Sequence, residues 1–303
     1  MSKKKSTAIR LSKGDQIMET TINIVMAILF LVVLYPMVYV VSSSFSSGQA
    51  VSQGKVMLWP VEPTTYGYEL VFRFPKVWTG YKNTIINTVV GTLMNVFTTT
   101  LVAYPLSRRD LQGKGFYIFI FMFTMWFGGG LIPTYMLMSN LGLINNRLSV
   151  LLTGLVSVSN MVVMRSFFRS SIPGDLHDAA RVDGISDIGY LVKIVLPLSK
   201  AIFSVITLYY AVAHWNAYFS AMLYLRDAEM VTLQQVLKDI LDASTANTSD
   251  MQGMTAEEAV ALQHSADLMK YSLIVVSAAP ILCAYPIVQK YFEKGVMVGS
   301  VKG

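Results

Sequence analysis

The sequence predicts an all-α integral membrane protein with six transmembrane helices, both termini in the cytoplasm and a cytoplasmic helical element between spans four and five. The prediction rests on a low content of charge, on long apolar runs, and on basic residues gathered at their ends. The 303 residues are 53% apolar and only 14% charged. A soluble domain usually carries about 25% charged residues, so this composition is typical of a bilayer protein.

The apolar runs are long enough to cross a membrane, which takes about 20 residues for a core of about 30 Å. We expect spans at about 16–41, 81–106, 116–138, 148–168, 201–224 and 268–288. The basic start, 1–15, also resembles the start of a signal peptide. The run after it exceeds the roughly 7–15 residues of a signal core, and no small-residue cleavage site follows. An uncleaved first span is therefore favoured.

Three of these spans carry sequence irregularities. Span 81–106 is rich in Asn, Thr and Gly, which favours helix–helix packing over lipid contact. Span 116–138 is interrupted by the glycines 128–130 and by Pro133, and we expect a structural break there or, alternatively, an outer gate. The last span contains Pro280 and Pro286, and Cys283 is expected to be packed inside it. Between the first two spans, 42–80 is expected to form an interfacial connection with short helices.

The distribution of Lys and Arg predicts the orientation. Most of the 24 basic residues fall in 1–15, in the turn 107–115, in 171–197 with its flanks, and in the C-terminal tail. The positive-inside rule places these segments in the cytoplasm. The acid-rich segment 226–267 then lies outside, where it either meets an external partner or is simply solvated. Because the basic residues follow topology in this way, the net charge of +6 does not indicate nucleic-acid binding.

Several enzymatic functions are excluded by missing motifs. The chain has no phosphate-binding loop of the G-x-x-x-x-G-K-[ST] type and is therefore not itself an evident ATPase. Its single cysteine allows no internal disulfide, and its three histidines, His177, His214 and His264, lie far apart. We predict no catalytic residue, no metal site and no cofactor.

The segment 171–197 is too densely charged for hydrocarbon and is expected in water. Pro173 suits a first helical turn, and Gly184 suits a left-handed helix end. Ser186 or Asp187 can cap a second helix. We expect an apolar strip on one side of the first helix, continued on the second, formed by Leu176, Ala179, Ala180, Val182, Ile188, Leu191, Val192 and Val195. From these residues alone, a compact helical element and a simple connecting loop are equally compatible with the sequence.

The same segment resembles the signature of permease subunits of bacterial ATP-binding-cassette importers, E-A-A-x-x-D-G, nine residues, I-x-L-P. Asp178 stands where the family usually has Glu and keeps the charge. The matching positions are Asp178, Ala179, Ala180, Asp183, Gly184, Ile194, Leu196 and Pro197. Further stretches resemble the maltose-type branch of sugar importers: NTIINTVVGTLMNV, AYPLSRRDLQGKG, PTYMLMSNLGLINN, HWNAY and the ending QKYFEKGVMVGSVKG. FGGGLIPTY is similar to a subgroup associated with complex plant or algal oligosaccharides.

The resemblance implies a transmembrane domain of the type I importer class over 16–303, in the bacterial inner (cytoplasmic) membrane. It implies that 171–197 docks onto a nucleotide-binding subunit, and that ATP is hydrolysed there, so that this chain is not an enzyme. The implied partners are a second permease in a heterodimer, two ATPase subunits, an extracytoplasmic solute-binding protein and a carbohydrate. The residues implied in coupling are Asp178, Ala179, Ala180, Asp183, Gly184, Leu196 and Pro197; the C-terminal tail is a further candidate contact.

Polar and aromatic side chains in the fifth span are candidates for the sugar path, because polar groups at membrane depth are costly unless they serve a function. They are Tyr209, Tyr210, His214, Trp215, Asn216 and Tyr218. The alternative is that they hold this chain against the partner permease.

Three other functions compete. A membrane-embedded enzyme needs paired acids or a His/Asp cluster, and none is evident. A proton-coupled secondary transporter needs carboxylates inside spans, and the central parts of the predicted spans have none. An ABC importer permease for a solute other than sugar remains an alternative.

Overall fold

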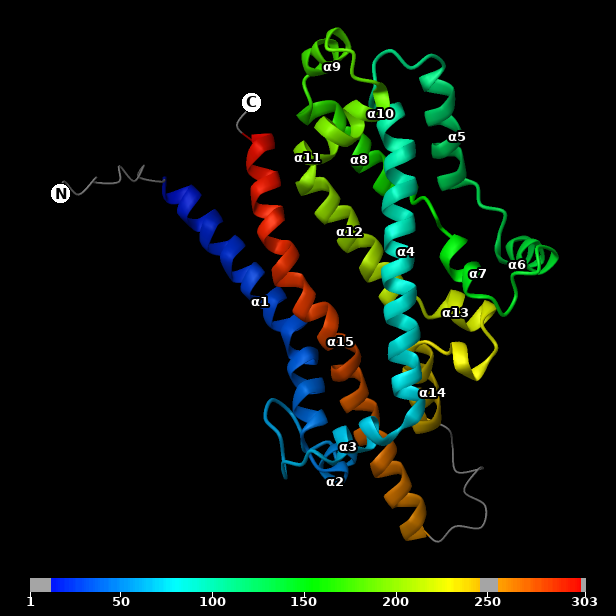
Figure 1. Ribbon diagram of the computed structural model, residues 1–303. Helices are drawn as coiled ribbons and strands as arrows, with labels where there is room; N and C mark the ends of the chain where they lie inside the picture. The colour runs from blue at the N-terminus through cyan, green and yellow to red at the C-terminus, as the bar shows by residue number, and fades with distance from the viewer. Residues whose placement is uncertain (1–11, 246–255, 301–303) are drawn as a thin grey trace. The chain divides into compact units, whose positions relative to one another are not determined.

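The computed structural model describes residues 12–245 and 256–300, and these ranges contain helices and turns but no strand (Figure 1). The predicted all-α class is confirmed. Three helices are long and apolar enough to cross a membrane, or up to five spans result if each of two bent helix pairs counts as one. The chain divides into two compact units, Met1–Val71 with Ser244–Val275, and Phe72–Ala243 with Val276–Gly303.

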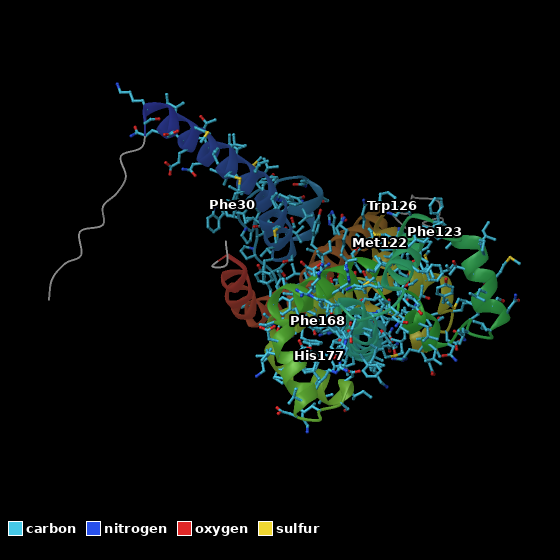
Figure 2. All side chains as sticks on the ribbon, turned by 90° about the horizontal axis from the view of Figure 1, so that it is seen from above. Phe30, Met122, Phe123, Trp126, Phe168 and His177 are labelled. Carbon is cyan, nitrogen blue, oxygen red and sulfur yellow. The ribbon has the colours of Figure 1, made fainter. Side chains whose placement is uncertain are left out.

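The first unit is built on α1 (Lys13–Ser44), which begins with a reciprocal cap. The Ser12 hydroxyl accepts from the Asp15 N–H, and the Asp15 carboxylate accepts from the Ser12 N–H. Most apolar side chains of α1 are unburied within the chain, as Phe30 illustrates in Figure 2. A long apolar helix without a protein partner on its sides is suited to lipid contact.

Close packing in the first unit depends on small residues. The predicted short helices are present as α2 (Gly48–Ser52) and α3 (Tyr66–Arg73), which pack against the first part of α15 (Ala256–Ser300). A Cβ at Gly67 would lie 2.4 Å from the Ser272 hydroxyl and 2.9 Å from the Leu268 carbonyl oxygen. Only glycine permits this approach, because the Leu268 carbonyl belongs to the backbone of α15 and cannot move aside.

The second unit is organised around α4 (Pro75–Ser107), which contacts α12 (Lys200–Trp215) and α8 (Val158–Ser171). Their apolar core contains Met161, Met164 and Ile206, all fully buried. The polar residues of α4 are buried as predicted: Asn83, Asn87, Gly91, Asn95, Thr99 and Thr100. Span two therefore packs against protein.

The two ends of α4 carry different elements (Figure 1). At one end lie α9 (Gly174–Val182) and α10 (Asp187–Tyr190), and at the other lie α13 (Phe219–Tyr224) and α14 (Leu233–Thr245). At the second end, the Asn83 amide donates to the carbonyl oxygens of Glu229 and Val231, at 2.7 and 2.9 Å. The segment 171–197 and residues 226–243 therefore lie toward opposite ends of α4.

The expected third span is sharply broken. It consists of α5 (Lys114–Trp126) and α6 (Leu131–Asn140), which are bent by 109° at the glycine run. Gly130 has φ +87°, a conformation that a residue with a Cβ rarely adopts. Met122, Phe123 and Trp126 project from α5 and are exposed (Figure 2).

The helices in the expected spans 148–168 and 201–224 are interrupted. The first consists of α7 (Arg147–Leu152) and α8, separated by residues 153–157, where Gly154 has φ +76°. In the second, α12 ends at Trp215, before α13 begins, and it is bent by 84° from Asp187–Leu198. Gly154 lies in the first break, and Ser199 lies at the bend before α12; glycine and serine are common at such kinks.

The last helix also differs from its predicted form. α15 begins at Ala256, inside the expected outer segment 226–267, and its candidate span is Leu262–Pro286. Cys283 is exposed and not packed in the interior of the chain. Most of the basic segment 1–15 and the last three residues of the C-terminal tail lie outside the described residues.

Candidate coupling site and translocation pocket

The segment 171–197 forms a compact helical corner. Gly184 has φ +73° and ends α9: its N–H donates to the Arg181 carbonyl oxygen (3.1 Å), and the Ile185 N–H donates to the Ala180 carbonyl oxygen (2.9 Å). This pair of bonds is the Schellman arrangement. The Ser186 hydroxyl then accepts from the Gly189 N–H and caps α10. Both helix signals were predicted, and of the two suggested caps Ser186 fills the role.

The predicted apolar strip is not one buried face. Ala180 is 3% exposed and packs with Tyr190 and Val195, whereas Val182 is 89% and Ile188 76% exposed. The signature positions divide in the same way. Asp178, Ala179, Asp183, Gly184 and Pro197 are exposed, Leu196 is half-buried, and Ala180 alone is buried. The corner is therefore anchored through the buried Ala180. Its acidic side chains and the apolar side chains of Val182 and Ile188 are exposed to solvent.

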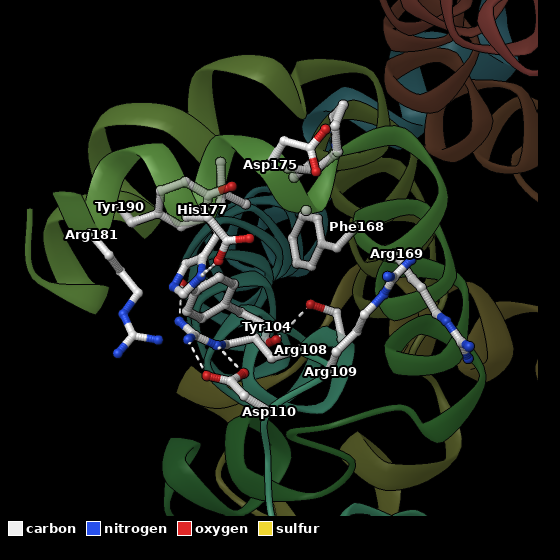
Figure 3. Close-up of a pocket in the computed structure, with 16 residues that line it drawn as sticks. Tyr104, Arg108, Arg109, Asp110, Phe168, Arg169, Asp175, His177, Arg181 and Tyr190 are labelled. Carbon is white, nitrogen blue, oxygen red and sulfur yellow. Dashed lines mark hydrogen bonds and ion pairs between the residues drawn. The ribbon is translucent and has the colours of Figure 1, made fainter. Parts of the chain in front are cut away.

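An arginine at the end of α4 ties this corner to the rest of the second unit (Figure 3). The Arg108 guanidinium donates two bonds to Asp110, at 2.6 and 2.8 Å, and one to Asp187, at 2.5 Å. Asp187 is the first residue of α10, and His177 of α9 lies 3.4 Å from the same carboxylate. The three helices α4, α9 and α10 thus share one polar cluster.

The cluster shifts the ionisation of its members. Hydrogen bonding to Asp110 raises the pKa of Arg108 above its usual range, and the reciprocal bonds hold the pKa of Asp110 well below its usual range. The pKa of Asp187 is lowered first by the bond from Arg108 and then by His177. All three groups are charged at neutral pH, and Arg108 is only 16% exposed. The contact is therefore ionic, although solvent reaches both carboxylates.

A cavity of about 290 Å³ opens beside this cluster. It is lined by Arg108, Asp110 and His177 of the cluster and, among other residues, by Arg109, Arg169, Arg181, Asp175 and Asp178 (Figure 3). The mixed charges suit a contact with a charged protein surface. Across the described residues, no group of three or more His, Cys, Asp or Glu side chains could hold a metal ion.

A second cavity of about 290 Å³ lies where α7 and α8 separate. Of the predicted path residues, it brings together Tyr209, Tyr210 and His214. The His214 ring nitrogen Nε2 lies 2.8 Å from the Asn95 side-chain oxygen, and the Tyr210 hydroxyl lies 2.7 Å from that of Thr99. Polar side chains from α4 and α12 therefore meet at the break.

The other three predicted path residues lie elsewhere. Trp215 is 7% exposed and its indole N–H donates to the Ser277 carbonyl oxygen at 2.9 Å, which is a packing role. Asn216 is exposed outside the cavity lining. Tyr218 lines a different cavity, together with Lys76 and Asp239.

Sequence reasoning missed Arg108 and Asn95 as network centres. Arg108 entered only as one of the basic residues that indicate topology, although its spacing from Asp110 immediately after a span was a usable signal. Asn95 was expected only to support helix packing. Its actual partners are carbonyl groups freed by a helix break that the sequence did not predict.

The chain was compared with known proteins. No model of a known protein family matches it. It is 36% identical over 273 residues to the polygalacturonan/rhamnogalacturonan transport system permease protein YtcP of Bacillus subtilis (strain 168), covering 90% of this chain and 94% of YtcP. It is 34% identical to protein LplC of the same organism, over 90% of each chain.

A solved structure also places this chain among transporter permeases. The crystal structure of a bacterial ABC transporter involved in the import of the acidic polysaccharide alginate contains a chain 37% identical to this one, with a TM-score of 0.82. The match covers 94% of this chain and 100% of the other. This chain therefore belongs to the carbohydrate permeases of ABC import systems, multi-pass proteins of the bacterial cell membrane.

Proposed function

We propose that this permease imports oligosaccharides derived from acidic plant or algal polysaccharides, as one subunit of an ATP-driven importer. The observation that carries the proposal is the near-full-length likeness to a polygalacturonan/rhamnogalacturonan permease and to a chain of an alginate importer. Polygalacturonan and alginate are both polymers of sugar acids. Likeness of this extent favours a related cargo, although the binding partner also contributes to selection.

The proposed topology keeps six crossings in a transmembrane domain over 16–303, with both termini and 171–197 in the cytoplasm. Here α7 and α8 make the fourth crossing together, despite the break between them. Unwound backbone is tolerated at membrane depth when protein groups satisfy it, as Asn95 does for the carbonyls of Gly154 and Leu155. The acid-rich segment 226–267 lies outside, available to a solute-binding protein.

We propose that the corner around Gly184 docks onto an ATPase subunit. Its exposed acids, Asp178 and Asp183, suit basic partner residues, and the exposed Val182 and Ile188 suit an apolar groove. Closure of two ATPase subunits would move the corner as a rigid body, because the Schellman bonds hold the corner together and the Arg108 cluster joins it to α4. ATP hydrolysis belongs to those subunits, and a second permease completes the path.

The competing readings differ in their source of energy or in their cargo. A proton-coupled carrier is disfavoured because the central parts of the predicted spans contain no Asp or Glu. An importer of a non-sugar solute is disfavoured because the relatives with informative names carry carbohydrates, including polygalacturonan and rhamnogalacturonan.

The test is uptake by vesicles that contain the complex purified through a tag on this chain, supplied with its solute-binding protein. Labelled digalacturonate is the probe and maltose the comparison sugar. We expect digalacturonate uptake to require internal ATP, to survive a protonophore and to exceed maltose uptake. Uptake that survives ATP depletion but stops with the protonophore would contradict the proposal, and equal uptake of maltose would contradict the assigned cargo.

A further inference from the structure

The cavity at the α7–α8 break has an uncharged polar lining. Its walls come from α4, from residues 150–160 and from α12 with the segment after it. Among its lining residues there is no Asp, Glu, Lys or Arg, and the polar ones include Asn95, Ser157, Asn160, His214 and Ser220. Such a lining can bind a ligand rich in hydroxyl groups, whereas an ionised ligand would find no opposite full charge.

One wall of the cavity is held in place by hydrogen bonds. The Asn95 amide donates to the carbonyl oxygens of Gly154 and Leu155, at 2.9 and 3.0 Å, and its oxygen pairs with the His214 ring. Asn95 is 2% exposed. The Tyr210 hydroxyl accepts from the Ser157 N–H at 2.9 Å. These groups are occupied with one another, so they shape the cavity and do not serve as free ligand contacts.

Other polar groups in the lining are free to bind. Within the described residues, the Asn160 side-chain amide and the hydroxyls of Tyr209 and Ser220 make no hydrogen bond. The Tyr209 side chain is 49% exposed, so its ring is also accessible. At membrane depth an unpaired polar group is costly, which favours a polar occupant for these three groups.

We propose that this cavity is a sugar subsite that takes one ring of the oligosaccharide through its hydroxyl groups. The Tyr209 ring offers a flat surface for the apolar face of a pyranose, and Asn160 and Ser220 offer hydrogen bonds to its hydroxyls. The volume, about 290 Å³, lies near the lower end for small-molecule pockets and suits a single ring better than a chain.

The inference rests on the proposed function, since it assumes a carbohydrate cargo, and it adds a specific consequence. Because the lining contains no Lys or Arg side chain, the subsite binds the hydroxyl groups of the sugar and does not recognise its carboxylate. Discrimination between acidic and neutral sugars must then occur at another point of the transport cycle. The alternative occupant is a helix of the partner permease, for which Asn160 and Tyr209 would be packing contacts.

The experiment compares Asn160→Ala and Tyr209→Ala with Ser159→Ala, which alters an exposed position on the same helix outside the cavity lining. Uptake of digalacturonate and of its methyl ester is measured in vesicles with the whole importer. We expect each cavity variant to lower the uptake of both sugars by the same factor, roughly 3- to 10-fold, as expected for the loss of one polar contact. Ser159→Ala should match the wild type.

Assembly and ATPase activity separate the possible outcomes. Complexes with the cavity variants should purify with all subunits, and their ATPase stimulation by the binding protein should equal that of the wild type. Loss of the partner permease in step with uptake would overturn the subsite in favour of packing. Unchanged uptake, or a loss confined to the acidic form, would also overturn it. A wild-type importer that moves neither sugar would overturn the proposed function as well.

Discussion

At one end of α4, Arg108 gathers Asp110 and Asp187 into a charged cluster, whereas midway along the same helix Asn95 joins the α7–α8 break to His214 through uncharged amide and imidazole groups. The first cluster is open to solvent at its carboxylates, and the second is centred on a residue 2% exposed. The difference follows from the cost of burying charge. Ionic groups hold the solvent-exposed end of α4, and neutral polar groups hold its buried middle.

The largest expected effect is at the buried network. Asn95→Leu keeps the number and branching of the side-chain heavy atoms but leaves the Gly154 carbonyl and the His214 ring without their partner, while the Leu155 carbonyl keeps its bond from the Thr98 hydroxyl. We expect a loss of about 2–4 kcal/mol in stability, because each orphaned group costs about 1 kcal/mol or more. The thermal unfolding midpoint of the purified complex measures it. Asn216→Leu, at an exposed asparagine, is the control; equal losses in both variants would refute the role of Asn95.

A slightly smaller effect is expected from filling the space that His214 occupies. A Cβ at Gly91 would lie 2.5 Å from two atoms of the imidazole ring. Gly91→Ala should therefore displace His214 from Asn95 and cost about 1–3 kcal/mol, despite the better helix propensity of alanine.

Gly115→Ala is the matched control, because nothing lies within 4 Å of its added Cβ. It should leave the unfolding midpoint unchanged or raise it slightly. Adding His214→Ala to Gly91→Ala should remove most of the clash. A double variant as unstable as the sum of the two single ones would show that the glycine and the ring do not interact.

The smallest effect is expected at the charged cluster. Arg108→Gln should cost about 0.5–1 kcal/mol near neutral pH, because solvent screens both carboxylates. The pKa values of Asp110 and Asp187 are lowered in the folded state, so their stabilisation is complete above the unfolded value of about 3.9. This stabilisation is lost as the pH falls below the unfolded pKa and through the lower pKa values of the folded state.

The difference in unfolding midpoint between wild type and Arg108→Gln should thus be constant from about pH 8 to pH 5 and shrink below about pH 4. Arg109→Gln serves as control, since Arg109 is an exposed neighbour with no ion pair in the described residues. A difference that grows on acidification would contradict the ionic account of the cluster.

The two regions were not equally predictable from sequence. The corner at Gly184 could be predicted from the sequence. A left-handed glycine and a capping serine act over only a few residues, so their signals are local. The break between α7 and α8 could not be predicted, because residues 148–168 are apolar enough to form a continuous helix. Its stability comes from Asn95, some 60 positions away in the chain. The same holds for Arg108 and Asp187, which are 79 positions apart.

The path residues illustrate the same limit. Tyr209, Tyr210 and His214 line one cavity together with other polar groups, but Trp215 and Tyr218 follow them in sequence and face other surroundings. Trp215 is the last residue of the helix and turns toward the Ser277 carbonyl, and Tyr218 lies beyond the helix end, where the helical period no longer applies. Sequence spacing predicts which residues share a face of a helix only within that helix, not beyond its end.

The central claim is that the corner at Gly184 couples ATP hydrolysis to transport, and it is tested by the number of ATP molecules hydrolysed per sugar imported. Gly184→Val and Gly142→Val impose the same strain, since both glycines have positive φ (+73° and +67°) and open space around an added Cβ. The account predicts a several-fold higher ratio for Gly184→Val and a wild-type ratio for Gly142→Val, with all subunits retained in both. A wild-type ratio in both variants would contradict it.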